Sequence, residues 1–201
     1  MKINFSSLLS LFLSHTCPIC CRQTTEIICC ACQIQIESEK LTRPTKFWQG
    51  QLPVFVWGNY SAEVKKAIKK FKYNNQAEIG EFFGEILAKA WLESDFLQNK
   101  TKLLVIPIPL HPEKFKNRGF NQAEIIARHF CQITGYRLKS DGLLRVRQTK
   151  AMYSLNFSQR QANVKYAFCL GKNWRKQDKN SQILLLDDIY TTGAREHRQH
   201  R

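Results

Sequence analysis

Apolar and polar positions follow distinct spacings along this chain, and each spacing predicts a different element. Over residues 61–73, apolar positions recur every three or four residues opposite a row of lysines, which predicts an amphipathic helix that Ser61 caps. The same spacing over residues 79–91 predicts a second helix with a wide buried face. Residues 53–57 are apolar, and we expect a strand there. The lysine row is interpreted as a solvated face, with a ligand site as the alternative.

Two continuous apolar runs predict buried strands. Residues 103–109 form one run, and Pro107 and Pro109 must lie at its C-terminal end because proline cannot complete a sheet ladder. A loop is expected over residues 111–120, and then a helix that starts at Asn121 and stops at Gly135. Residues 183–186 form the second run. Strand, helix and strand in this order predict an α/β fold with a parallel sheet and right-handed crossovers.

Length and charge narrow the class of protein. The 201 residues include 43% hydrophobic ones, so a wholly disordered chain is excluded, and no apolar run approaches the length of a membrane-spanning helix. We expect a small module over residues 1–45, a polar linker, and one domain over residues 50–201. With 31 Lys+Arg against 16 Asp+Glu, the net charge is +15. This charge suggests a phosphorylated ligand, a nucleic acid or an acidic protein as partner, or simply a basic solvated surface.

The N-terminal segment resembles a signal peptide only superficially. Residues 1–14 are rich in Leu and Phe, but four serines interrupt the apolar run and a cysteine cluster follows at once. We therefore expect a short amphipathic helix that packs on the body of the protein. Without a targeting signal the expected location is the cytoplasm, where thiols stay reduced.

Six of the eight cysteines lie between positions 17 and 32, and four of these six form two C-x-x-C pairs. The expected ligands of a structural zinc ion are Cys17, Cys20, Cys29 and Cys32. Each pair places two thiolates on one tight turn, and two such turns close a tetrahedral shell. Cys21 and Cys30 could replace a ligand, and a disulfide framework or a dithiol redox centre are the alternatives. Four thiolates and one zinc ion carry −2, which would lower the net charge from +15 to +13. Cys131 and Cys169 are expected to be buried thiols.

A second chemical signal follows the last apolar run. Two carboxylates, Asp187 and Asp188, come directly after it and precede the turn Thr191-Thr192-Gly193. Ligands of open α/β sheets bind at the carboxyl ends of the strands, and small residues there let backbone N–H groups approach a phosphate. Phosphate binding is therefore one interpretation, and a capped turn before a surface helix is the other.

The segment 183–194 closely resembles the phosphoribosyl-pyrophosphate (PRPP) signature of type I phosphoribosyltransferases. Four other features resemble the ComF/ComFC (GntX-like) family: the double C-x-x-C, the tract 60–73, the segments 107–110 and 118–122, and the segment 145–149 with the residues that follow it. The resemblance runs from Cys17 to Ala194. It implies a type I phosphoribosyltransferase-like parallel sheet, flanked by helices and preceded by a small zinc module.

The resemblance also implies roles for individual residues. Asp187 and Asp188 would hold the ribose hydroxyls of PRPP, and Arg118 lies in the loop that would bind pyrophosphate, with Mg²⁺ bridging the ligand oxygens. The residues implied for the 5′-phosphate are Thr191, Thr192, Gly193 and Ala194. The residues that would form a mobile hood are Arg147, Thr149, Arg160 and Asn163, although a basic surface around a short helix is an equal alternative. No catalytic residue and no acceptor is implied.

The sequence departs from that pattern after Ala194. The pattern continues with another small hydroxyl residue, an amphipathic helix and a core strand, whereas residues 195–201 are almost entirely charged or polar. We interpret this as a C-terminal truncation or frameshift, with a natural basic terminus as the alternative. The expected consequences are weaker PRPP binding and an exposed hydrophobic patch.

Two hypotheses for function remain. The first is an enzyme, or an inactive copy of one, that transfers phosphoribosyl from PRPP to an unidentified acceptor. The second is a non-catalytic factor in competence and DNA uptake that binds single-stranded DNA or a helicase partner. Aromatic residues that could stack on bases in the second case are Phe47, Trp48, Trp57 and Tyr60.

Overall fold

The structure is a computed structural model, and it describes residues 15–49, 51–73, 76–96, 103–147, 165–172, 174, 175, 178 and 181–190. In chain order the elements are β1 (His15–Thr16), β2 (Gln23–Thr24), α2 (Cys30–Glu37), α3 (Ala62–Tyr73), α4 (Glu78–Leu92), β3 (Leu103–Pro107), α5 (Pro112–Arg118), α6 (Gln122–Thr134), β4 (Arg137–Leu138), β5 (Leu143–Arg145), β6 (Phe168–Leu170) and β7 (Gln182–Leu186). The helix expected over residues 1–14 lies outside the described residues. No helix of the described part is both long and apolar enough to cross a membrane.

Three parallel strands form the central sheet, in the order β4-β3-β7. Strand β3 pairs with β7 over its full length, from Leu103 opposite Gln182 to Pro107 opposite Leu186. All five residues of β3 are buried, and Pro107 is its last residue. The predicted buried parallel strand, the position of the proline and the α/β class are therefore confirmed.

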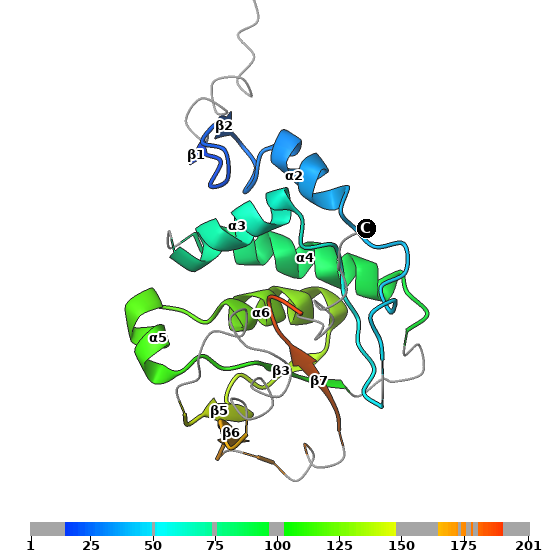
Figure 1. Ribbon diagram of the computed structural model, residues 1–201, viewed down its shortest axis with the longest axis vertical. Helices are drawn as coiled ribbons and strands as arrows, with labels where there is room; N and C mark the ends of the chain where they lie inside the picture. The colour runs from blue at the N-terminus through cyan, green and yellow to red at the C-terminus, as the bar shows by residue number, and fades with distance from the viewer. Residues whose placement is uncertain are drawn as a thin grey trace, which may run out of the picture.

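The elements lie in successive layers. Figure 1 shows β1, β2 and α2 at one end of the molecule, then α3 and α4, then α6, and then the sheet. A continuous hydrophobic core joins these layers, because buried residues of α2, α3, α4, α6 and the sheet belong to one cluster. The short antiparallel pair of strands β5 and β6 lies beyond the sheet.

The two predicted amphipathic helices form where the spacing places them. The Ser61 hydroxyl accepts a hydrogen bond from Val64 N at 3.4 Å, as expected of a residue that caps α3. The buried face of α3 consists of Val64, Ala67, Ile68 and Phe71. Helix α4 crosses α6 closely at Gly84, where an added Cβ would lie 2.6 Å from the Cβ of His129.

The strand expected over residues 53–57 does not form. Two backbone hydrogen bonds of 2.9 Å tie this extended segment to residues 41–44, and no strand ladder develops. Its aromatic side chains pack on α4 instead, with the Phe55 ring 5.1 Å from the Trp91 ring. Packing of aromatic rings against a helix therefore holds the segment in place without a partner strand.

The loop expected over residues 111–120 contains the helix α5. Pro112 occupies its first turn, where the missing N–H costs nothing, and the His111 side chain accepts a hydrogen bond from Glu113 N at 3.4 Å. Gly119 ends the helix in the left-handed conformation with φ of 82°. Start and stop signals were therefore present, but the helix is too short for a periodic apolar pattern.

Three expectations about burial and capping need correction or refinement. Helix α6 begins and ends as predicted, with Gly135 at φ of 73°, but the Asn121 side chain donates to Ile108 O at 3.0 Å instead of capping the helix. Strand β7 is buried on one face only, because Ile183 and Leu185 are 52% and 54% exposed. The exposed hydrophobic patch expected at this strand is thus present. The two remaining thiols differ: Cys131 is buried as predicted, whereas Cys169 is exposed on β6.

Candidate functional site

The two C-x-x-C pairs form one compact cluster. The Sγ atoms of Cys17, Cys20, Cys29 and Cys32 all lie within 4.8 Å of one another. The first pair lies in the turn between β1 and β2, where Cys21 N donates to Cys17 O at 2.9 Å and Cys21 adopts a left-handed φ of 66°. The second pair lies at the start of α2, with Cys29 as the residue before the helix. A helix N-terminus favours negative charge, so it stabilises thiolates.

The charges of the four thiols are strongly interdependent. Burial opposes ionisation of Cys17, but backbone N–H groups that donate to its Sγ outweigh burial and lower the pKa of Cys17 to about 6. Burial and the neighbouring cysteines raise the pKa of Cys32. Cys17 therefore ionises readily, whereas Cys32 remains protonated to higher pH, in part because adjacent thiolates repel one another.

This donor set fits a zinc ion. Tetrahedral ligands at the usual Zn–S distance of about 2.3 Å have sulfur atoms about 3.8 Å apart, which the observed cluster accommodates. A divalent cation at the centre would also remove the repulsion between thiolates. Cys21 and Cys30 are exposed and lie outside the cluster, so the structure does not use them as replacement ligands.

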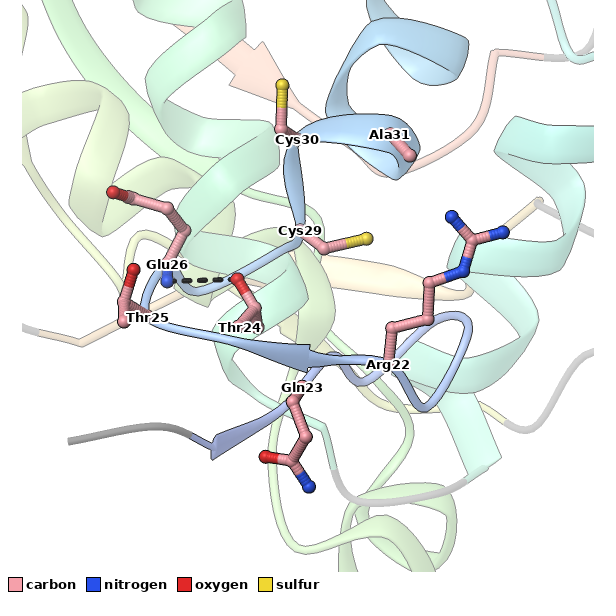
Figure 2. A pocket seen from close by; sticks show the side chains of 8 residues that line it. All are labelled: Arg22, Gln23, Thr24, Thr25, Glu26, Cys29, Cys30 and Ala31. Carbon is pink, nitrogen blue, oxygen red and sulfur yellow. Dashed lines mark hydrogen bonds between the residues drawn. The ribbon is translucent and has the colours of Figure 1, made fainter. Parts of the chain in front are cut away.

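A shallow hollow of about 540 Å³ lies beside the cysteine cluster. Figure 2 shows the side chains around it and the hydrogen bond of 3.1 Å that Glu26 N donates to Thr24 Oγ1. The lining residues are Arg22, Gln23, Thr24, Thr25, Glu26, Cys29, Cys30 and Ala31. None of them is a residue predicted to bind a phosphate, so this hollow is separate from the charged site described next.

Asp187 and Asp188 follow the last residue of β7, at the carboxyl end of the parallel sheet. The Asp188 carboxylate is 12% exposed and forms an ion pair with Lys72 at the end of α3. The Asp187 side chain reaches solvent, and Asp188 N donates to its Oδ1 at 2.8 Å. Desolvation by the surrounding protein and the neighbouring Asp188 charge nevertheless raise the pKa of Asp187 to about 7.

Several cations surround this pair of carboxylates. Burial is the main cause that lowers the pKa of Lys114 on α5, and three nearby positive charges add to it. Those charges belong to Arg145, Arg118 and Lys72. Burial also lowers the pKa of Arg145, and Asp187 opposes that change. Cations from α3, α5 and β5 therefore share one electrostatic environment with the carboxylates of β7.

Gln122, the first residue of α6, adds an unused hydrogen-bond donor. Its side chain is buried and accepts a hydrogen bond from Arg118 Nη1. Because arginine only donates, the atom that faces it must be Oε1, and the remaining amide nitrogen is Nε2. That buried nitrogen has no hydrogen-bond partner among the described atoms. The amide therefore offers a donor to a ligand oxygen.

A buried ion network holds the chain before β7. Asp178 is 2% exposed and accepts hydrogen bonds from Arg137 Nη2 at 2.7 Å and from Arg175 N at 2.9 Å. Lys139 Nζ lies 3.9 Å from the same carboxylate. The backbone hydrogen bond from Arg175 is the first of the causes that lower the pKa of Asp178. The network joins β4 to the segment that leads into β7.

The described part of the structure brings together only some of the residues predicted to bind PRPP. Asp187, Asp188 and Arg118 belong to the charged region, and Arg147 is exposed just after β5. The remaining predicted residues, Thr149, Arg160, Asn163, Thr191, Thr192, Gly193 and Ala194, lie outside the described residues. Sequence reasoning assigned no role to Lys72, Lys114, Arg145 or Gln122. The only available signal was that most of them fall within or next to the motifs.

Comparison with known proteins gives consistent relatives. The chain is 26% identical over 196 residues to the competence protein ComFC of Bacillus subtilis (strain 168), which covers 91% of this chain and 69% of that protein. It is 30% identical over 135 residues to ComFC of Streptococcus pneumoniae, covering 67% of this chain and 54% of that protein. It is 24% identical over 190 residues to the DNA utilization protein YhgH of Escherichia coli O6:H1, covering 89% and 79%.

No family model and no solved structure matches the chain. The relatives nevertheless agree with one another, and the alignments with ComFC of Bacillus subtilis and with YhgH cover about nine tenths of this chain. Two of the sequence segments that carry the resemblance, the double C-x-x-C and the residues 183–188, form the cysteine cluster and the strand that ends in two carboxylates. The chain belongs to the ComF family.

Proposed function

We propose that this protein binds PRPP with Mg²⁺ at the carboxyl end of β7 and acts in DNA uptake in the cytoplasm, on a type I phosphoribosyltransferase-like fold. One observation supports the proposal above all. Two carboxylates, a group of cations and an amide donor without a partner occur together at the end of two parallel strands. A ligand that combines hydroxyl groups with phosphates needs this combination, because carboxylates accept from hydroxyls and cations pair with phosphates.

Each part of the site has a task in this proposal. Asp187 and Asp188 accept hydrogen bonds from the ribose hydroxyls. Arg118, Lys114 and Gln122 Nε2 face the pyrophosphate group, where positive charge and hydrogen-bond donors stabilise the departing oxygens. The Thr191–Ala194 turn takes the 5′-phosphate. Mg²⁺ bound together with the ligand would supply further neutralisation of the phosphate charge.

The proposed reaction is phosphoribosyl transfer to an acceptor that remains to be identified. The bond between C1 and pyrophosphate breaks, pyrophosphate leaves with the electron pair, and a nucleophilic atom of the acceptor forms the new bond to C1. Residues of this chain contribute by positioning the ligand and stabilising the charge of the leaving group.

Calorimetric titration of PRPP with Mg²⁺ tests the proposal directly. Wild-type protein should bind, and the double variant Asp187→Asn, Asp188→Asn should not bind measurably. Glu63→Gln, a change at an exposed carboxylate of α3, serves as the control and should bind like wild type. Equal binding by the double variant and the control would refute the assignment of the site, and no binding by folded wild type would refute the function.

A second candidate function is binding of single-stranded DNA. It is favoured by the net charge of +15 and by two exposed aromatic side chains, Trp48 and Tyr60, at 44% and 46% exposure. Phe47 and Trp57 are less exposed, and the Trp57 ring packs against Phe83. Fluorescence anisotropy with a labelled oligonucleotide should show affinity that falls steeply as salt rises. Affinity that does not respond to salt would exclude binding through the basic surface.

A further inference from the structure

The last turn of α3 contacts two parts of the candidate site, the end of α5 with the loop that follows it and the carboxylates that follow β7. Three consecutive residues make these contacts. The Phe71 ring stacks on Phe120 with centroids 5.6 Å apart, and the Tyr73 ring lies 5.6 Å from the guanidinium carbon of Arg118. Between them, Lys72 forms the ion pair with Asp188. One turn of one helix thus joins the loop after α5 to the carboxylates after β7.

Lys72 differs from the other lysines of its helix. Lys65, Lys66 and Lys69 are exposed, as a solvated face requires, whereas the Lys72 side chain is 20% exposed. Its partner Asp188 is 12% exposed, so both charges are largely removed from water. Holding two such charges is costly unless each compensates the other, which makes this pair unlike an ordinary surface ion pair.

The packing of α3 fixes the position of Lys72. Phe71, the residue before it, is fully buried, and its ring closes so tightly on α4 that a Cβ on Gly80 would lie 2.4 Å from it. At its other end, α3 packs against α2 in the core cluster that includes Cys17 and Cys32. The backbone of the last turn is therefore anchored, and Lys72 can respond to a ligand only through its side chain.

The surrounding charges define what Lys72 can do. Asp187 and Asp188 are adjacent carboxylates, and Arg145 interacts with Asp187. Lys114 in turn lies close enough to Arg145, Arg118 and Lys72 for their charges to lower its pKa. Without a ligand, Lys72 is the cation that pairs with Asp188. A ligand whose hydroxyl groups donate to Asp188 would replace Lys72 as the partner of this carboxylate. Its phosphates would at the same time bring negative charge within reach of the released ammonium group, and lysine's unbranched side chain suits such a change of partner.

We infer that Lys72 is a further ligand-binding residue, which neutralises Asp188 in the ligand-free protein and pairs with a phosphate oxygen once ligand hydroxyls occupy Asp188. The inference rests on the proposed binding of PRPP. It adds to that proposal a residue from α3, in a helix whose lysine row looks like a solvated face in the sequence. It also gives a function to the Phe71-Lys72-Tyr73 segment, which otherwise only resembles the family pattern.

The experiment compares Lys72→Met with Lys72→Arg and with Lys65→Met, which removes an exposed charge at the other end of the same helix. Carboxyl-carbon NMR on the ligand-free proteins follows the titration of Asp187, and calorimetry measures the binding of PRPP with Mg²⁺. Lys72→Met should move the midpoint of the Asp187 titration to higher pH, because a nearby positive charge is lost. It should weaken PRPP binding by about tenfold or more, as expected for loss of a charge-assisted contact. Lys72→Arg should retain most of both properties.

The outcomes separate this inference from the proposed function. Unchanged Asp187 titration in Lys72→Met would overturn the inference, and so would PRPP binding as tight as in Lys65→Met. Absence of PRPP binding in wild type would overturn the proposed function and with it the ligand step, whereas the NMR titration would still decide whether Lys72 neutralises the carboxylates.

Discussion

Gly84 offers a test of how closely α4 and α6 pack. Replacing it with alanine introduces a Cβ that would lie 2.6 Å from the His129 Cβ and 2.7 Å from the carbonyl oxygen of Ile126. Ordinary contacts begin at 3.4 Å, so the two helices would have to separate by about 0.8 Å at this point. One of the two atoms is backbone, and the other is fixed to the backbone. A change of side-chain rotamer therefore cannot relieve the clash.

Two effects of opposite sign decide the result. Alanine is favoured over glycine inside a helix by about 1 kcal/mol, which stabilises the variant. Overpacking of a well-filled interface costs about 1–3 kcal/mol, which destabilises it. Because the contacts are with backbone-fixed atoms, we expect overpacking to prevail, with a net loss of about 1 kcal/mol for Gly84→Ala and a larger loss for Gly84→Val.

Urea denaturation followed by circular dichroism measures this difference as a shift of the midpoint at constant slope. The two substitutions form a size series, so the loss should grow from alanine to valine. A Gly84→Ala variant more stable than wild type would show that the helices separate at little cost and that helix propensity dominates, contrary to the close packing described here.

Three further predictions concern charge and metal. Cys32→Ser should abolish binding of one zinc ion per chain, measured by elemental analysis, and should lower the thermal midpoint, whereas Cys21→Ser, outside the cluster, should change neither. The pKa of Asp187 is raised to about 7, so its contribution to stability is present below pH 4 and lost as pH rises through 7. In Asp187→Asn, the free energy of unfolding should therefore change less with pH in this interval. An unchanged slope would contradict the raised pKa. The pKa of Asp178 is lowered from its usual 3.8, so its contribution to stability is present above that pH and lost as pH falls below it. Asp178→Asn should therefore lower the thermal midpoint more at pH 7 than at a pH well below 3.8, and equal losses would refute the ionic role.

Elements with many regular positions could be predicted from the sequence. Helices α3, α4 and α6 show apolar faces over three turns or more, and β3 is apolar throughout, so local patterns determine them. The segment 53–57 also looks like a strand, but strand formation needs a neighbour, and the sequence does not show that its aromatic rings pack on α4. The exposed face of β7 has the same origin, since an apolar run does not reveal how many faces are covered.

The candidate site was predictable in proportion to how local its chemistry is. The cysteine cluster follows from spacing within 16 residues, because C-x-x-C turns bring their own thiolates together. Asp187 and Asp188 were identifiable for the same reason, as adjacent carboxylates at a strand end. Lys72 was not, because it acquires its role from the approach of a helix end to a loop that is distant in the sequence. Gln122 was not either, because the sequence does not show that its amide is buried with one nitrogen left without a partner among the described atoms. Periodicity shows which lysines share a helix face but not which one meets a carboxylate.

The buried thiol of Cys131 makes the opening of α6 observable by chemistry. Burial raises the pKa of this thiol to about 12, so at neutral pH only roughly one molecule in 100,000 carries the reactive thiolate in the folded state. The exposed thiols of Cys21, Cys30 and Cys169 remain open to solvent reagents at all times and can be blocked first. Slow labelling of Cys131 by an alkylating reagent would then count the openings of α6 under native conditions, and its rate would rise in Gly84→Ala by the factor that the loss of stability predicts.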